Sequence, residues 1–168
     1  MTQRERIVVV TGEIGAGKTT YCRQQIDAAW RIHQDVAGVL SPARFEHGDK
    51  VGIDALDLRS GEMRPLAHLR TPKGQSGAET IVTQRWRFEP ETLSWVNQIL
   101  MAATPCDLLV VDELGPLELE QARGWTAALD AVATRAFATA LIVVRDSLLT
   151  VALTRWPDAE VVQIKRPV

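Results

Sequence analysis

The amino-acid sequence predicts an α/β domain with a mainly parallel central sheet, flanked by helices and carrying a small antiparallel hairpin insertion. Three observations support this fold class. Short, uniformly apolar runs at residues 7–10 and 108–111 are typical of strands buried on both faces. Segments of helical period separate such runs, as in strand–helix–strand units. One intervening stretch alternates apolar and polar residues around a Ser60-Gly61 turn, which is typical of a hairpin.

The first half of the chain supplies two strand–helix elements and the hairpin. Residues 7–10 are β-branched throughout and end at a glycine-rich turn, so they predict a buried strand. Cys22, Ile26 and Trp30 share a helix face, which predicts a helix over residues 18–33. The remaining expectations here are a strand at 35–40, hairpin strands at 51–58 and 63–66, an exposed loop at 67–80 and a short strand at 80–83.

The second half repeats the alternation of helices and strands. Pro90 suits a first helical turn, and the neighbouring acids complement the positive helix end. A helix is therefore expected from about residue 89 to residue 101. The other expected elements are a strand at 107–111, a helix at 117–136, a strand at 139–144, a short helix at 147–155 and a strand at 160–164. We expect residues 1–168 to form one domain.

Composition excludes several classes of protein. The formal net charge of -2 shows no excess of basic residues, so no nucleic-acid partner is expected. Cys22 and Cys106 lie far apart and outside any CxxC pair, which argues against a disulfide framework or a structural zinc site. The apolar runs are too short for a signal peptide or a membrane span. A soluble, cytoplasmic protein with no membrane contact is the expectation.

A glycine-rich motif follows the first predicted strand and opens the first predicted helix. It fits G-x-x-x-x-G-K-[ST] at every fixed position. Its glycines let backbone N–H groups approach phosphate oxygens, Lys18 can contact the β- and γ-phosphates, and Thr19 can bind Mg²⁺. The sequence therefore predicts a P-loop nucleotide-binding site. The residues expected to bind nucleotide are Gly12, Glu13, Ile14, Gly15, Ala16, Gly17, Lys18, Thr19 and Thr20.

Two carboxylates, Asp112 and Glu113, end the apolar strand at residues 107–111. Ligands of open α/β sheets bind at the carboxyl ends of the strands, where these acids lie. We expect Asp112 to support Mg²⁺ together with Thr19. Glu113 can orient and deprotonate an attacking water, so it is the expected general base. The alternative is a strand end that happens to be acidic.

The acidic strand end continues into a longer motif, Asp112-Glu113-Leu114-Gly115-Pro116-Leu117-Glu118-Leu119, which resembles the D-E-[IL]-G-x-[LM]-E-L signature of the THEP-type nucleoside-triphosphatases. The glycine-rich motif is similar to that family's P-loop, and residues 38–62 resemble its middle segment. The resemblance covers most of the chain. It implies a RecA-like P-loop fold and Mg²⁺-dependent hydrolysis of ATP, GTP and other nucleoside triphosphates. Three departures bear on base recognition. Pro42 and Ala43 stand where the family has an acid before the middle arginine, the stretch before Trp86 departs from the family's G-x-Y pattern, and the Asn-Arg usually found near the family's C-terminus is missing.

Three further residues have open alternatives. Arg44 matches the family's middle arginine and could reach a γ-phosphate, or it could be a solvated loop residue. Arg145 ends a buried strand and could act on the phosphates, or it could pair with Asp146 or another neighbouring acid. Trp86 lies between two arginines and could stack on a base, although an anchor between a strand and the core is favoured.

The leading functional hypothesis is an Mg²⁺-dependent nucleoside-triphosphatase in which Lys18 and Glu113 are catalytic, with Arg44 and Arg145 as further candidates. A nucleotide-dependent switch acting on a protein partner is the first alternative. A small-molecule kinase is the second, and it would require a binding site for a phosphoryl acceptor. The sequence leaves the base preference and the oligomeric state open.

Overall fold

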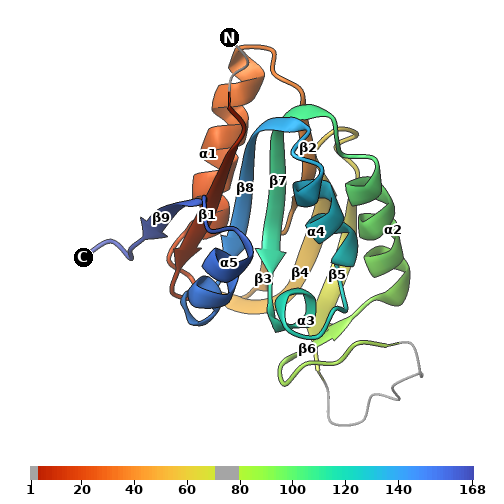
Figure 1. The fold of residues 1–168 in the computed structure, drawn as a ribbon. Coiled ribbons are helices and arrows are strands. Elements are labelled where there is room, and N and C mark those ends of the chain that lie inside the picture. Colours follow the sequence, from red (N-terminus) through yellow and green to blue (C-terminus); the bar gives the residue numbers. More distant parts are fainter. Residues whose placement is uncertain (1–3, 71–79) are drawn as a thin grey trace.

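The computed structural model describes residues 4–70 and 80–168, and nine strands of this part form one sheet. The strand order is β6-β5-β4-β2-β7-β8-β1-β9, with β3 paired to β4 (Figure 1). The strands are β1 (Arg6–Gly12), β2 (Val36–Leu40), β3 (Ala43–Glu46), β4 (Asp49–Asp57), β5 (Met63–Leu69), β6 (Trp86–Phe88), β7 (Cys106–Leu114), β8 (Phe137–Val144) and β9 (Glu160–Ile164). The helices are α1 (Lys18–Arg31), α2 (Pro90–Met101), α3 (Pro116–Leu119), α4 (Thr126–Ala133), the 3₁₀ turn η1 (Asp146–Leu148) and α5 (Leu149–Arg155).

The parallel part of the sheet contains β2, β7, β8, β1 and β9. Val9 and Val10 of β1 are fully buried, as are Leu109 and Val110 of β7. Their uniform burial explains the uniformly apolar runs, because both faces of these strands are covered. The predicted α/β fold with a mainly parallel central sheet is confirmed.

The antiparallel part contains the expected hairpin, formed by β4 and β5, and two strands that the sequence did not predict. β3 pairs with β4, and β6 pairs with β5. The prediction of a strand at 80–83 is wrong. Of these residues only Val82 takes part in β pairing, through an isolated bridge to Arg87. Residues 67–69 of the predicted loop continue β5, whereas residues 71–79 lie outside the described part of the chain.

Helices cover both faces of the sheet (Figure 1). On one face, Cys22 and Ile26 of α1 pack with Val8 and Val10 of β1 in one apolar cluster. On the other face, α2, α4 and α5 contribute to a second and larger cluster, which includes the buried Trp125. The molecule is therefore a three-layer α/β structure whose strand ends are left to form sites.

The helix predicted over residues 117–136 is two separate helices, α3 and α4. Ala122 and Gly124 between them have positive φ angles of 50° and 73°, which a continuous right-handed helix does not contain. Glu118 explains where the chain turns, because its carboxylate accepts hydrogen bonds from the N–H groups of Gly115 (2.8 Å) and Trp125 (3.0 Å). The acid therefore connects the start of α3 to the residue before α4.

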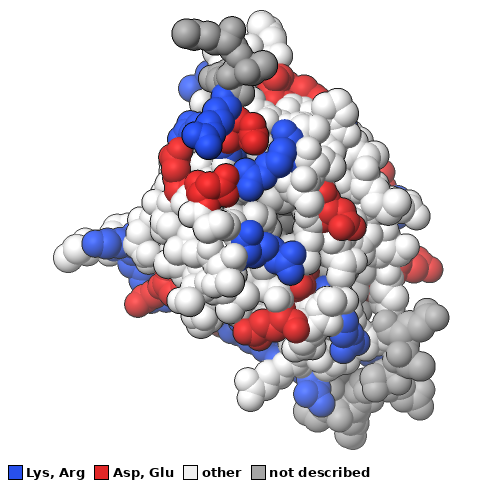
Figure 2. Space-filling model, in the orientation of Figure 1, with Lys and Arg blue, Asp and Glu red and all other residues white. Residues whose placement is uncertain are grey.

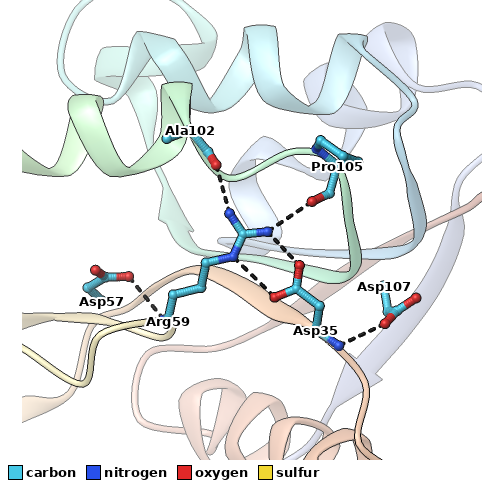
Figure 3. Close-up of polar contacts among 6 residues, drawn as sticks. All are labelled: Asp35, Asp57, Arg59, Ala102, Pro105 and Asp107. Carbon is cyan, nitrogen blue, oxygen red and sulfur yellow. Dashed lines mark hydrogen bonds and ion pairs between the residues drawn. The ribbon is translucent and has the colours of Figure 1, made fainter.

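A polar cluster around Arg59 joins elements at the amino edge of the parallel strands (Figure 3). Its guanidinium donates two hydrogen bonds to Asp35, from Nε (3.1 Å) and Nη2 (2.6 Å). It also donates to the carbonyl oxygens of Ala102 (2.8 Å) and Pro105 (2.9 Å). One side chain thus connects the β4–β5 turn to the residues before β2, after α2 and before β7.

Charged side chains of both signs are interspersed on the face shown in Figure 2. Among residues 4–70 and 80–168, no helix is long and apolar enough to cross a bilayer. Cys22 is a buried free thiol and Cys106 a partly buried one, in agreement with the absence of a CxxC motif.

Candidate functional site

The glycine-rich loop, residues 12–17, connects β1 to α1 at the carboxyl edge of the parallel strands. Gly17 has a φ of 103°, a conformation that side chains rarely adopt. Gly12 is restricted further, because a Cβ atom there would collide with the carbonyl oxygen of Ile164 in β9. The motif glycines are therefore explained by backbone geometry and by close packing against β9.

Lys18 is the first residue of α1, and its side chain is buried inside the glycine-rich loop. Its Nζ donates hydrogen bonds to the carbonyl oxygens of Gly12 (2.7 Å) and Glu13 (2.9 Å). Thr20 lies exposed in the same helical turn. The positive charge of Lys18 is thus held where the loop and the helix N-terminus also favour anions.

Asp112 at the end of β7 lies beside the first turn of α1, although β8 separates β7 from β1 in the sheet. Its Oδ2 accepts hydrogen bonds from Thr19 Oγ1 (2.9 Å) and from the N–H of Ser41 (3.2 Å). The hydroxyl of Ser41 donates to the main-chain carbonyl of Asp112. Residues from α1, β7 and the end of β2 therefore meet at one carboxylate.

Asp112 as a whole residue is only 2% exposed. Burial, and secondarily the charge of Glu113, raises its pKa to about 7, while hydrogen bonds from Ser41 and Thr19 act in the opposite direction. A carboxylate in this position is destabilised until a positive charge or further donors approach it.

The donor set of Thr19 and Asp112 fits Mg²⁺. Both supply hard oxygen atoms, which lie 2.9 Å apart. Mg²⁺ is usually bound by one or two protein oxygens together with substrate phosphates and water. In the described part of the chain, no group of three or more His, Cys, Asp or Glu side chains forms an all-protein metal site.

Glu113 follows Asp112 through a cis peptide bond, and its side chain is about one third exposed. Its Oε1 accepts a hydrogen bond from Arg145 Nε at 3.1 Å. The alternative partner, Asp146, instead accepts hydrogen bonds from Thr11 (3.0 Å) and Gln163 (3.1 Å). Arg145 therefore pairs with the candidate base, Glu113, rather than with its neighbour in the chain, Asp146.

Arg44 lies on β3, and its guanidinium crosses the face of Gly52 in β4. It donates to Asp54 Oδ1 at 3.0 Å, and its Nη2 lies 3.1 Å from His68 Nδ1. A Cβ atom on Gly52 would collide with this guanidinium. These contacts all lie within the antiparallel part of the sheet, so the structure gives Arg44 a role in joining β3, β4 and β5.

Two basic side chains, those of Lys50 and Arg166, lie close to the candidate site or to residues around it. Trp86 is buried in β6, in line with the favoured anchoring role, and Lys50 Nζ lies 5.3 Å from the centroid of its ring. Arg166, after β9, lies against the glycine-rich loop, with its Nε 3.7 Å from Glu13 Oε2. Lys50 belongs to the segment at 38–62 that resembles the family's middle segment, but the sequence predicted no role for Lys50 or for Arg166.

A family model described as NTPase matches residues 7–167. A nucleoside-triphosphatase THEP1 of Methanopyrus kandleri is 32% identical over 141 residues, which are 83% of this chain and 73% of that protein. A nucleoside-triphosphatase THEP1 of Archaeoglobus fulgidus is 31% identical over 113 residues, 67% of this chain and 62% of that protein.

Two solved structures share the fold. The solution structure of a human cancer-related nucleoside triphosphatase superposes with a TM-score of 0.69 at 21% identity, covering 94% of this chain and 88% of that chain. The crystal structure of THEP1 from Aquifex aeolicus gives a TM-score of 0.64 at 15% identity, covering 95% and 90%. At these identities the superpositions establish the fold, and the family model with the relatives establishes the family.

Proposed function

This chain belongs to the THEP1-type nucleoside-triphosphatase family, and we propose that it hydrolyses nucleoside triphosphates such as ATP and GTP to the diphosphate and phosphate with Mg²⁺. The enzyme class expected from the sequence agrees with the family. One observation carries the mechanism we propose. The hydrogen bond between Thr19 and Asp112 brings the end of the glycine-rich loop to the acidic end of β7, with Glu113 as the next residue.

Binding of the triphosphate depends on three features of the glycine-rich loop. Its N–H groups donate to phosphate oxygens, the N-terminus of α1 adds partial positive charge, and Lys18 supplies a full charge. Lys18 exchanges its contacts with the carbonyl oxygens of Gly12 and Glu13 for phosphate oxygens. This exchange is favourable because an ammonium binds an anionic oxygen more strongly than a neutral carbonyl.

Thr19 and Asp112 are the residues that would hold Mg²⁺. When bound there, Mg²⁺ would supply positive charge to the phosphate oxygens. A bound cation also stabilises the ionised form of Asp112, whose burial otherwise favours the protonated form.

Glu113 is the general base in this proposal. Its carboxylate takes a proton from water as the water oxygen bonds to the γ-phosphorus, and the bridging oxygen leaves with the electron pair on the diphosphate. Arg145 donates to Glu113 Oε1 and so fixes the direction of the carboxylate. That Arg145 also acts on the phosphate oxygens, as the sequence suggested, stays a prediction.

The test combines a panel of substrates with two variants. Phosphate release is measured with ATP, GTP, CTP and UTP, each with Mg²⁺ and with EDTA. Glu113→Gln should retain triphosphate binding and lower turnover by roughly two to four orders of magnitude, the usual contribution of a general base. Lys18→Ala should weaken binding and turnover together.

Glu120→Gln is the matched control, since Glu120 is an exposed acid of the same segment. Unchanged turnover in Glu113→Gln would contradict the mechanism. Phosphate that appears on an added acceptor, with none released, would favour the kinase alternative. A large rise in turnover on addition of a protein partner would favour the switch.

A further inference from the structure

We propose that Lys50 is a substrate-contacting cation that binds the terminal phosphoryl group from the β4 side of β7, whereas Lys18 binds from the β1 side. This inference rests on the proposed function and concerns a residue of the 38–62 segment for which the sequence predicted no role of its own. It is carried by the course of β4, by the contacts of Lys50 with its surroundings and by the charges that face it.

The course of β4 brings Lys50 to the carboxyl edge of the parallel strands. β2 ends at Leu40, which pairs with Leu56 of β4. Because β2 and β4 are antiparallel, residues 49–55 of β4 extend past the end of β2. β3 pairs with this extension, and both lie at the carboxyl ends of the parallel strands in Figure 1. The β3–β4 hairpin therefore borders the site, and Lys50 lies near its tip.

The Lys50 side chain is half-buried, with its Nζ 5.3 Å from the centroid of the Trp86 ring. The guanidinium of Arg85 lies at the same distance from that ring. An aromatic face attracts a cation but leaves its hydrogen-bond donors unsatisfied. No carboxylate oxygen of residues 4–70 and 80–168 lies within 4.0 Å of Lys50 Nζ.

The charges around Lys50 are those of the candidate active site. Glu113 and Asp112 attract its ammonium, and Arg85 and Arg145 repel it. Burial is the largest effect and lowers the pKa of Lys50, as expected for an ammonium that lacks a close anion. Of these charges, Glu113, the proposed base, has the largest effect on Lys50.

A polyanionic ligand would satisfy this arrangement. A half-buried ammonium with no ion-pair partner in the described part of the chain is costly, and a terminal phosphoryl group beside Glu113 would supply both charge and acceptors. The transferred phosphoryl group carries negative charge on its three equatorial oxygens in the transition state, so a cation held there beforehand stabilises it. A nucleoside diphosphate does not carry the group, so Lys50 should discriminate between triphosphate and diphosphate.

The experiment measures that discrimination in the full chain. The affinities of a non-hydrolysable ATP analogue and of ADP are determined by calorimetry for the wild type, Lys50→Gln and Lys50→Arg. In Lys50→Gln the preference for the triphosphate should fall by roughly tenfold or more, as for loss of a charge-assisted hydrogen bond. Turnover should fall in parallel, and Lys50→Arg should recover part of both.

Arg64→Gln is the matched control, because Arg64 also lies over a tryptophan, with its guanidinium carbon 4.4 Å from the ring centroid of Trp95. The Arg64→Gln variant should leave the preference for the triphosphate unchanged.

A second measurement needs no variant. The ATP analogue should protect Lys50 of the wild type from an amine-acylating reagent, and ADP should not.

The outcomes separate the two proposals. A wild-type chain that binds no triphosphate would overturn the proposed function itself. A wild type that binds and hydrolyses triphosphate, but whose Lys50 reacts equally with either nucleotide bound, would overturn only the role of Lys50. An unchanged preference in Lys50→Gln would do the same.

Discussion

Replacement of Arg59 by methionine should destabilise the protein without impairing its site. The guanidinium donates to two main-chain carbonyl oxygens, and each such bond contributes about 0.5–1.5 kcal/mol. The ion pair with Asp35 adds less, about 0.2–1 kcal/mol, because the two side chains are 37% and 48% exposed and water screens them. The sum is about 1–4 kcal/mol, or about 2–16 °C in Tm for a chain of this length.

The assay is urea unfolding followed by circular dichroism at 25 °C, together with the rate of phosphate release under native conditions. Arg64→Met is the control, since Arg64 forms an exposed ion pair with Glu62 and no comparable bonds to main-chain carbonyls among the described residues. It should lower the free energy of unfolding by less than about 1 kcal/mol. Turnover of folded Arg59→Met should match the wild type, because the cluster lies at the opposite edge of the sheet. Equal stability of the two variants would refute this estimate.

Two further predictions concern buried acids. Because the pKa of Asp112 is raised to about 7 in the folded state, the nucleotide-free protein should lose stability as the pH rises from 5.5 to 8, by up to about 2 kcal/mol. Urea titrations should show this slope diminished in Asp112→Asn, and an identical slope would contradict the assignment. Glu118→Ala should lower the free energy of unfolding by about 2–4 kcal/mol, because the N–H groups of Gly115 and Trp125 lose their acceptor. Glu120→Ala, which changes an exposed acid, should stay within about 0.5 kcal/mol of the wild type in the same assay, and equal losses would rule out this explanation.

Local patterns predicted the parallel core well, since burial on both faces produces continuous apolar runs. The strand at 160–164 matches β9, and the predicted hairpin is present as β4 and β5. The glycine-rich motif and the acidic strand end were also identified from sequence, and the structure brings Thr19 and Asp112 together.

The elements that were missed depend on tertiary contacts. β3 has only four residues, mostly exposed, so it carries no apolar alternation. The break between α3 and α4 follows from the positive φ of Ala122 and Gly124, and of these only the glycine was a visible signal. Lys50 lies on the part of β4 that extends past the end of β2, and this course of the strand depends on the pairing of β2 with β4.

The position of β1 has a consequence for biosynthesis. This strand is made before both of its partners, β8 and β9, as in the pairs of Val8 with Leu141 and with Glu160. Until those segments leave the ribosome, an apolar β-branched strand has no hydrogen-bonded neighbour. Nascent chains that end before β8 should therefore be prone to aggregation and dependent on chaperones.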